Sequence, residues 1–232
     1  MADVFQTATT DKDADMNPPA EIIREYGPFP GIDQVNGVTY DGRHVWLATG
    51  GTLQAVDPDS GQAARSFDAA TPAGTAFDGK VFYQIAGDRI QKIDPQTGKV
   101  LSTIPTPDGE GHSGLAWADG MLWVAHFDNR KIYQVDPETG KVLNTLESNR
   151  YVTGVTWVDG ELWHGTWENE ASELRQIDAR TGQVLASLDM PAGAGVSGLE
   201  SDGADRFFCG GGDSGKLRIV RRPRSRAAAP AP

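Results

Sequence analysis

Two histidines of this chain, His112 and His126, are the residues best suited to acid–base chemistry. An imidazole titrates near neutral pH, so either ring could accept or release a proton during a reaction. Glu200 or Glu168 could orient or complement that ring, which makes His112, His126 and Glu200 the candidate catalytic residues. Ring closure, elimination and hydrolysis all use such groups, and the residue types do not choose among them.

Trp167 is the candidate aromatic wall of a ligand site, because it is out of register with the other tryptophans. The others recur at equivalent positions and are expected in the core: Trp46, Trp117, Trp123, Trp157 and Trp163. The remaining candidate ligand-binding residues are Tyr151, Glu168, Asn36, Ser197 and Arg150. We therefore expect a small-molecule or peptide ligand as the partner.

A divalent ion could be held by His112, His126 and a carboxylate, since histidine and glutamate on adjacent strands form a workable set of ligands. Their spacing is not diagnostic, and we expect neither a metal nor another cofactor. The sequence also contains no hydrolase elbow, phosphate-binding loop or paired-cysteine motif.

Several of these residues have a purely structural interpretation. His126 ends a predicted strand and could simply hydrogen-bond a backbone carbonyl. His164 follows Trp163 within a strand, which favours packing between repeats. Glu168 and Glu170 could be solvated loop charges. The single cysteine, Cys209, excludes an intrachain disulfide and is expected to pack as a small apolar residue.

A repeat of about 40 residues must position these side chains. A turn sequence of the type Asp-x-x-x-Gly begins at Asp57, Asp94, Asp136 and Asp178. An Asp-Gly pair recurs at 41–42, 78–79, 119–120, 159–160 and 202–203. Both signals are typical of tight hairpins, and four short runs of β-forming residues lie between them in each repeat.

This pattern predicts an all-β fold, a five-bladed β-propeller with four antiparallel strands per blade. The innermost strands are expected to begin at Gly37, Gly74, Gly114, Gly154 and Gly198. The fifth repeat lacks an outer strand, and the segment Glu21–Tyr26 resembles the outer strands of the other repeats. We predict that this N-terminal strand closes the last blade and covers two sheet edges. A β-helix is the structural alternative, but its rungs are shorter.

The expected organisation is one propeller domain over residues 20–222, with disordered segments at 1–19 and 223–232. A net charge of −11 argues against nucleic acid or an anionic membrane as partner. The arginines at 218, 221, 222, 224 and 226 resemble a frayed basic tail. Because no apolar signal segment is visible, we expect a cytoplasmic protein, and we expect a monomer.

The two rims of the predicted ring differ in their variability. The turns after the first and third strands of each repeat are stereotyped, whereas the segments entering the first strand and the loops after the second vary. Variable loops on a repeated scaffold are the usual place for a site. The unusual side chains gather on this variable rim in repeats three and four, so we expect a funnel there.

The layout resembles the glutamine cyclotransferases of plants and bacteria, five-bladed propellers that cyclise N-terminal glutamine. The resemblance extends from Gly37 to Val220 and includes the segments 82–85 and 163–167, the latter similar to that family's Trp-Ala-Asn-Val-Trp. It implies that Trp167 is a substrate-pocket residue. The family's acidic residues are replaced in segments 34–38, 47–49 and 153–156. We therefore expect no glutamine cyclisation by the family's route.

Three functions remain open at this point. The first is an enzyme that acts on a small polar molecule by His and Glu acid–base chemistry. The second is a non-catalytic module that binds a small molecule or peptide in the same funnel. The third is a protein-docking platform, because propeller rims often serve that role.

Overall fold

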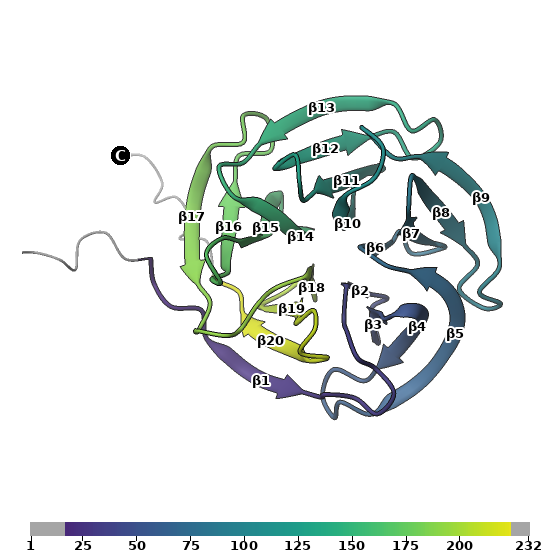
Figure 1. Ribbon diagram of the computed structural model, residues 1–232, viewed down its shortest axis with the longest axis horizontal. Coiled ribbons are helices and arrows are strands. Elements are labelled where there is room, and N and C mark those ends of the chain that lie inside the picture. Colours follow the sequence, from purple (N-terminus) through teal and green to yellow (C-terminus); the bar gives the residue numbers. More distant parts are fainter. Residues whose placement is uncertain (1–16, 224–232) are drawn as a thin grey trace, which may run out of the picture.

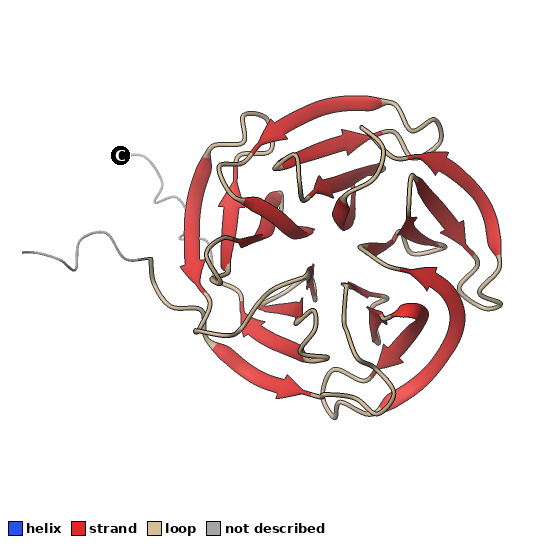
Figure 2. Cartoon of the chain, viewed as in Figure 1, coloured by secondary structure: helices blue, strands red, loops and turns tan. Residues whose placement is uncertain are grey.

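The structure is a computed structural model that describes residues 17–223. Five four-stranded antiparallel sheets form a ring around a central axis (Figure 1), and residues 17–223 contain strands and loops but no helix (Figure 2). No segment of this described part is therefore a helix capable of crossing a membrane. The prediction of a five-bladed β-propeller is confirmed.

Each blade runs from the axis outward, and its four strands are named here from the inside. The first blade comprises β2 (Gly37–Tyr40), β3 (Val45–Ala48), β4 (Gly50–Val56) and β5 (Ala63–Thr71). The second comprises β6 (Thr75–Phe77), β7 (Phe82–Ala86), β8 (Arg89–Ile93) and β9 (Val100–Pro105). The third comprises β10 (His112–Ala118), β11 (Met121–His126), β12 (Lys131–Val135) and β13 (Val142–Glu147). The fourth comprises β14 (Tyr151–Val158), β15 (Glu161–Trp167), β16 (Glu173–Ile177) and β17 (Val184–Asp189). The fifth comprises β18 (Gly198–Ser201), β19 (Arg206–Gly210), β20 (Leu217–Arg221) and, as its outer strand, β1 (Ile22–Tyr26).

The repeated Asp-x-x-x-Gly turns owe their shape to the aspartate side chain. In the first blade, Asp57 Oδ1 accepts the backbone N–H groups of Asp59 and Ser60 at 3.0 and 2.8 Å, and Gly61 N–H donates to the Asp57 carbonyl. The same carboxylate pattern recurs in the turns that begin at residues 94, 136 and 178. These bonds, together with hydrogen bonds from hydroxyl groups of the same turns, lower the pKa of each of the four aspartates. They fix the outer hairpins of the first four blades.

The inner strands meet in a ring of five glycines, at Gly37, Gly74, Gly114, Gly154 and Gly198. A β-carbon on Gly74 would lie 2.5 Å from the Leu115 nitrogen, and one on Gly114 would lie 2.3 Å from the Thr153 carbonyl oxygen. Such separations are far below van der Waals contact. Each inner strand can therefore approach the next only because the residue at this level has no side chain.

The ring closes as predicted, because β1 pairs with β20 in antiparallel register. The cluster of arginines that resembled a frayed tail belongs in part to this closure. Arg218 Nε donates to Glu25 at 2.8 Å, Arg221 pairs with Glu21 at 2.7 Å, and Arg222 pairs with carboxylates of the fourth blade. The expectation of a frayed segment is wrong for these three arginines, because acidic partners hold them in the folded domain.

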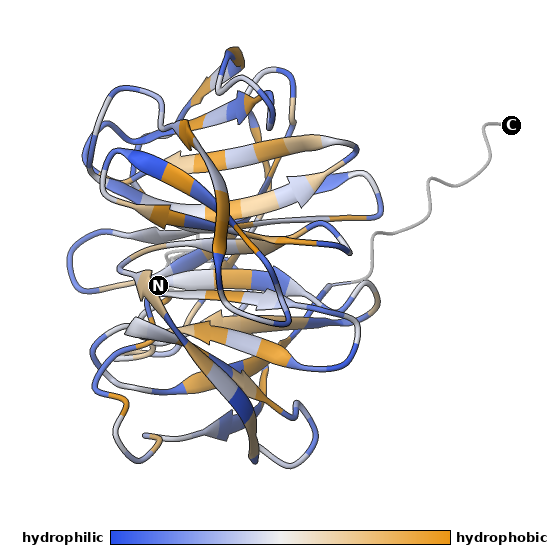
Figure 3. Cartoon of the chain, turned by 90° about the vertical axis from the view of Figure 1, so that its right-hand side faces the viewer, coloured by the Kyte–Doolittle hydropathy of each residue, from blue (hydrophilic) through white to orange (hydrophobic). Residues whose placement is uncertain are grey.

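Apolar side chains pack in layers between neighbouring blades, and polar and apolar residues alternate in bands along the strands (Figure 3). Trp46, Trp123 and Trp163 are buried, as predicted. Trp117 and Trp157 are only half-buried: Trp117 stacks on Tyr83 with ring centroids 5.4 Å apart, and Trp157 stacks on Trp123 at 6.0 Å. Their indole faces cover the blade interfaces rather than fill them.

The predicted disordered segments at residues 1–19 and 223–232 lie almost entirely outside the described residues. Residues 17–19, which the composition placed in the first segment, contact the fourth blade. Asn17 donates to the Asp189 carboxylate at 2.9 Å, and the Asp189 backbone donates to the Pro18 carbonyl. Residues 17–19 thus contact the propeller although they precede the predicted boundary at residue 20.

Candidate functional site

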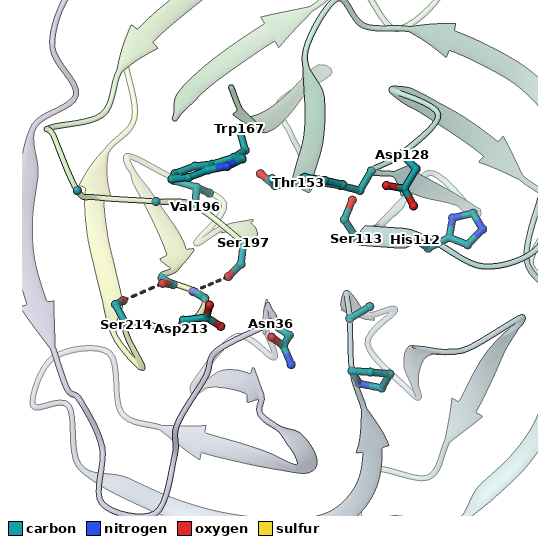
Figure 4. A pocket seen from close by; sticks show the side chains of 18 residues that line it. Asn36, His112, Ser113, Asp128, Thr153, Trp167, Val196, Ser197, Asp213 and Ser214 are labelled. Atoms are coloured by element: carbon teal, nitrogen blue, oxygen red, sulfur yellow. Dashed lines mark hydrogen bonds between the residues drawn. The ribbon is translucent and has the colours of Figure 1, made fainter. Parts of the chain in front are cut away.

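A cavity of about 580 Å³ opens on the variable rim of the ring (Figure 4). Its side chains and backbone come from the starts of the inner strands and from the loops after the second strands. They are Asn36, Pro72, Ala73, Gly111, His112, Ser113, Phe127, Asp128, Thr153, Trp167, Gly193, Gly195, Val196, Ser197, Gly211, Gly212, Asp213 and Ser214. The glycine ring lies directly beneath and leaves no room for a water molecule along the axis. The cavity is therefore a blind pocket rather than a channel.

Trp167 forms an aromatic wall of this pocket, as predicted. It ends β15 and is half-buried, and its ring lies above Val196 in Figure 4. A β-carbon on Gly195 would lie 3.3 Å from the indole, so the absence of a side chain there lets the loop pass close to the ring. The indole therefore packs on the 193–196 loop while it still lines open space.

Thr153 contributes a hydroxyl group that has no partner within the described residues. The side chain is 5% exposed and lines the pocket, and its Oγ1 atom makes no hydrogen bond there. A buried hydroxyl without a partner costs about 1–3 kcal/mol. The wall of the pocket thus contains a buried polar group that the described residues leave unsatisfied.

Ser197 ties the fifth blade to the first at the floor of the pocket. Its hydroxyl donates to the Val35 carbonyl and accepts the Gly212 N–H at 2.9 Å. Val35 and Gly212 also exchange two backbone hydrogen bonds of 3.0 Å. These bonds fix the loop 210–214, which presents the exposed carboxylate of Asp213 at the rim.

His112 lines the pocket, but its nitrogens are both directed at backbone carbonyls. Nε2 lies 2.7 Å from the Pro107 oxygen and Nδ1 lies 3.2 Å from the Ala125 oxygen. Burial lowers the pKa of this imidazole, and the neighbouring His126 ring adds to the effect. A neutral ring carries a single N–H, so it can donate to only one of these two carbonyls at a time.

His126 lies next to His112 but does not line the pocket. The two residues are cross-strand partners on β10 and β11, and their ring centroids are 4.5 Å apart. His126 is 3% exposed, and its ring nitrogens face the backbone N–H and the side-chain amide of Asn129 at 3.3 and 3.2 Å. Its contacts are those of a loop-fixing residue, made with Asn129 and with the backbone of Glu110.

Tyr151, Arg150 and Glu168 lie behind the pocket wall rather than on it, so the structure does not bring them to the ligand space. Tyr151 stacks on Phe127 at 4.6 Å between centroids, with the Arg130 guanidinium 4.1 Å from its ring. Glu168 pairs with the same arginine at 3.4 Å. Arg150 pairs with Glu173 at 2.8 Å, a partner that the sequence pattern did not indicate.

Glu200 is separated from the pocket by the glycine ring. It follows Gly198 by two residues along β18, toward the opposite rim, and its carboxylate accepts hydrogen bonds from Thr156 and Thr39 at 2.6 and 3.0 Å. Burial raises the pKa of this carboxyl. We expected Glu200 and the histidines at the same pocket, and the structure does not place them together. Along the inner strand β18, Glu200 lies beyond the glycine ring.

The structure thus brings together four of the predicted site residues: His112, Trp167, Asn36 and Ser197. It adds side chains that the sequence interpretation did not select, above all Thr153, Phe127, Asp128 and Asp213. The two aspartates lie in the variable loops after the second strands, which was the signal that could have identified them. Within residues 17–223, no group of three or more His, Cys, Asp or Glu side chains is placed to hold a metal ion.

These features define a class: a five-bladed propeller with a blind pocket on the variable rim. Residues 45–204 match the family model of a repeat of unknown function, DUF6923. The match covers more than half of the chain, which therefore belongs to this family. No curated protein matches the sequence.

Among solved structures, the fold is similar to the glutaminyl cyclase of Myxococcus xanthus. The TM-score is 0.73 with 21% sequence identity, and the alignment covers 88% of this chain and 98% of the cyclase. The sequence-based prediction of a glutamine cyclotransferase-like propeller is thus confirmed for the fold. At this identity the likeness concerns the fold alone.

Proposed function

We propose that the protein binds a small polar molecule, or the end of a peptide, in the rim pocket. The observation that carries this proposal is at Thr153, a pocket-lining residue whose buried hydroxyl has no hydrogen-bond partner among residues 17–223. Buried polar groups are nearly always paired, so an unpaired one at a cavity points to a ligand or an ordered water.

The rest of the pocket supports the same proposal. A volume of about 580 Å³ falls within the range of small-molecule sites. Trp167 lines the pocket together with the Asn36 amide and the hydroxyls of Ser113 and Ser197. These two hydroxyls also donate to the backbone carbonyls of Val152 and Val35. Such a combination of an apolar surface with a few converging polar groups is typical of ligand sites.

A thermal-shift panel tests the proposal. The compounds, at millimolar concentration, are amino acids, amines, carboxylates, lactones, glutaminyl peptides and divalent ions. A ligand of the folded state raises the melting temperature. We expect at least one compound to raise it in the wild type but not in Trp167→Ala. Trp157→Ala is the matched control, because Trp157 is also half-buried but lies outside the pocket. The absence of any Trp167-dependent compound would reject the proposal.

A second candidate function is acid–base catalysis on the bound molecule, and one contact favours it. Because neutral His112 can serve only one of the carbonyls of Pro107 and Ala125, a proton gained by the ring would complete the second hydrogen bond. Burial opposes that gain and keeps the ring neutral near pH 7. A neutral imidazole at the edge of a pocket has the protonation state of a general base.

Incubating each binding compound with the protein and detecting products by mass spectrometry tests this second candidate. A general base contributes about 10²–10⁴-fold, so His112→Gln should slow turnover by at least about tenfold. An unchanged rate would remove His112 from the mechanism. For glutaminyl peptides we expect no ammonia release above background, because no glutamate lines the pocket and the predicted Glu200 lies outside it.

A further inference from the structure

We infer that the pocket selects small organic cations that carry an ammonium group. This inference rests on the proposed function and names the ligand class of that same site. Three independent features of the pocket support it: the sign of its charged groups, the pairing of the nearby arginines, and the surfaces that an ammonium group would contact.

The charged side chains of the pocket are all negative. Asp128 follows β11 in the third blade and Asp213 follows β19 in the fifth, and Figure 4 shows them on opposite sides of the opening. Both are exposed at the rim. In the described part of the chain, no lysine or arginine lines the cavity, and burial keeps the ring of His112 neutral near pH 7. An anion would therefore meet repulsion without a compensating positive group.

The arginines nearest to the pocket already have partners. Arg218 is buried behind Gly211 and donates to Glu25 at 2.8 Å and to the Gly195 carbonyl at 2.9 Å. Arg130 pairs with Glu168 at 3.4 Å and donates to the Asn149 carbonyl at 2.8 Å. Arg130 is thus paired within the protein, whereas Arg218 shares the Glu25 carboxylate with Lys216, whose Nζ lies 2.6 Å from it. Neither arginine lines the pocket.

The neutral surfaces of the pocket also suit an ammonium group. The face of an indole attracts cations through its negative quadrupole, so Trp167 offers a favourable contact. The unpartnered Thr153 Oγ1 is a hydrogen-bond acceptor, and an ammonium N–H is a donor. Thr153 is the second observation that points to a ligand, independent of the acidic side chains. The net charge of −11 further favours the approach of cations.

The test compares three molecules of similar size that differ in charge: benzylammonium, benzyl alcohol and benzoate. Their affinities are measured by calorimetry at low salt on the folded, full-length protein, together with the thermal-shift panel above. We expect benzylammonium to bind at least tenfold more tightly than the alcohol, with no binding of benzoate. Raising the salt concentration should weaken the binding of benzylammonium but not that of the alcohol.

Two variants and one matched control assign the effect to the pocket. Asp128→Asn and Asp213→Asn should each weaken benzylammonium binding at least threefold and leave benzyl alcohol unchanged. Asp88→Asn removes the same charge from the equivalent loop of the second blade, outside the pocket, and should change neither.

The outcomes separate this inference from the proposed function. If Trp167-dependent ligands are found and the neutral or anionic ones bind as well as the cations, the inference is overturned and the binding function stands. Equal losses in Asp88→Asn and in the pocket variants would also overturn it, because the effect would then be one of net charge. If the panel and the three probes yield no Trp167-dependent ligand, both are rejected.

Discussion

Gly154 lies so close to Leu199 that a β-carbon on residue 154 would be 2.1 Å from the Leu199 backbone nitrogen. The contact joins the inner strands of the fourth and fifth blades, and equivalent contacts join all five inner strands in turn. Because the chain makes the close contact through its backbone, no rotamer change could relieve a clash there. The glycine ring is therefore both the narrowest point of the axis and the floor of the pocket.

Gly154→Ala should destabilise the protein by about 3 kcal/mol, the upper end of the usual effect of overpacking, because the added methyl group meets backbone rather than a flexible side chain. The control is Gly51→Ala, where a β-carbon would meet nothing within 4 Å, and which should be neutral or slightly stabilising. Chemical denaturation of both variants measures the free energy of unfolding. Equal stabilities would show that the ring relaxes at little cost.

The fold was predictable because its determinants are local or periodic. The Asp-Gly and Asp-x-x-x-Gly signals act within a few residues, and their carboxylates bond to the adjacent backbone. The glycines that begin the inner strands recur with the same period. The closure by β1 could also be predicted, since a repeat without an outer strand needs one from elsewhere. The partners of individual charges, such as Arg218 with Glu25, could not, because they depend on the three-dimensional register.

The ring closure should be sensitive to Glu25 but not to Glu21. Glu25→Gln removes the negative charge that pairs with both Arg218 and Lys216. It leaves the Arg218 guanidinium, whose side chain is 4% exposed, without a charged partner. We expect a loss of about 1–3 kcal/mol. Glu21→Gln breaks the exposed pair with Arg221 and should cost about 0–1 kcal/mol. Denaturant titrations of the two variants, side by side, measure both, and similar losses would contradict the assignment.

Stability should fall with pH below neutrality because of His164. Burial lowers the pKa of this imidazole to about 4, while an unfolded histidine has a pKa of about 6.5. Between these pH values His164 is protonated in the unfolded state but not in the folded state. Its contribution to the free energy of unfolding is therefore fully present above about pH 6.5 and declines as the pH falls to about 4. The contribution is about 3 kcal/mol.

Comparing the wild type with His164→Gln at pH 7 and pH 4.5 tests this expectation. The variant should lose less stability over this interval than the wild type, by about 2–3 kcal/mol. An unchanged slope in His164→Gln would assign the pH dependence to other groups, such as His112 and His126, whose pKa values burial also lowers.

The site was harder to predict than the fold. Trp167 could be identified because it departs from the repeat, and His112 because it stands at the start of an inner strand. Glu200 was wrongly assigned to the pocket, because the sequence does not show at which residue of the inner strand the glycine ring closes the axis. Thr153 carried no signal at all, since whether its hydroxyl has a partner depends on packing between blades.

Thr153→Val should weaken ligand binding without destabilising the free protein. The valine has the same shape but no hydroxyl, so the buried group without a partner disappears, and the free protein should be unchanged or more stable by up to about 1 kcal/mol. Ligands of the pocket should bind about 2–10-fold more weakly, the effect of one hydrogen bond.

Thr166→Val is the matched control. Thr166 is also buried, but its hydroxyl accepts the Glu173 N–H at 3.1 Å, so the loss of this hydroxyl should cost about 1–3 kcal/mol. Calorimetry and denaturant titrations of both variants decide the matter. If Thr153→Val destabilised the free protein as much as Thr166→Val, the Thr153 hydroxyl would have an internal role and would no longer indicate a ligand.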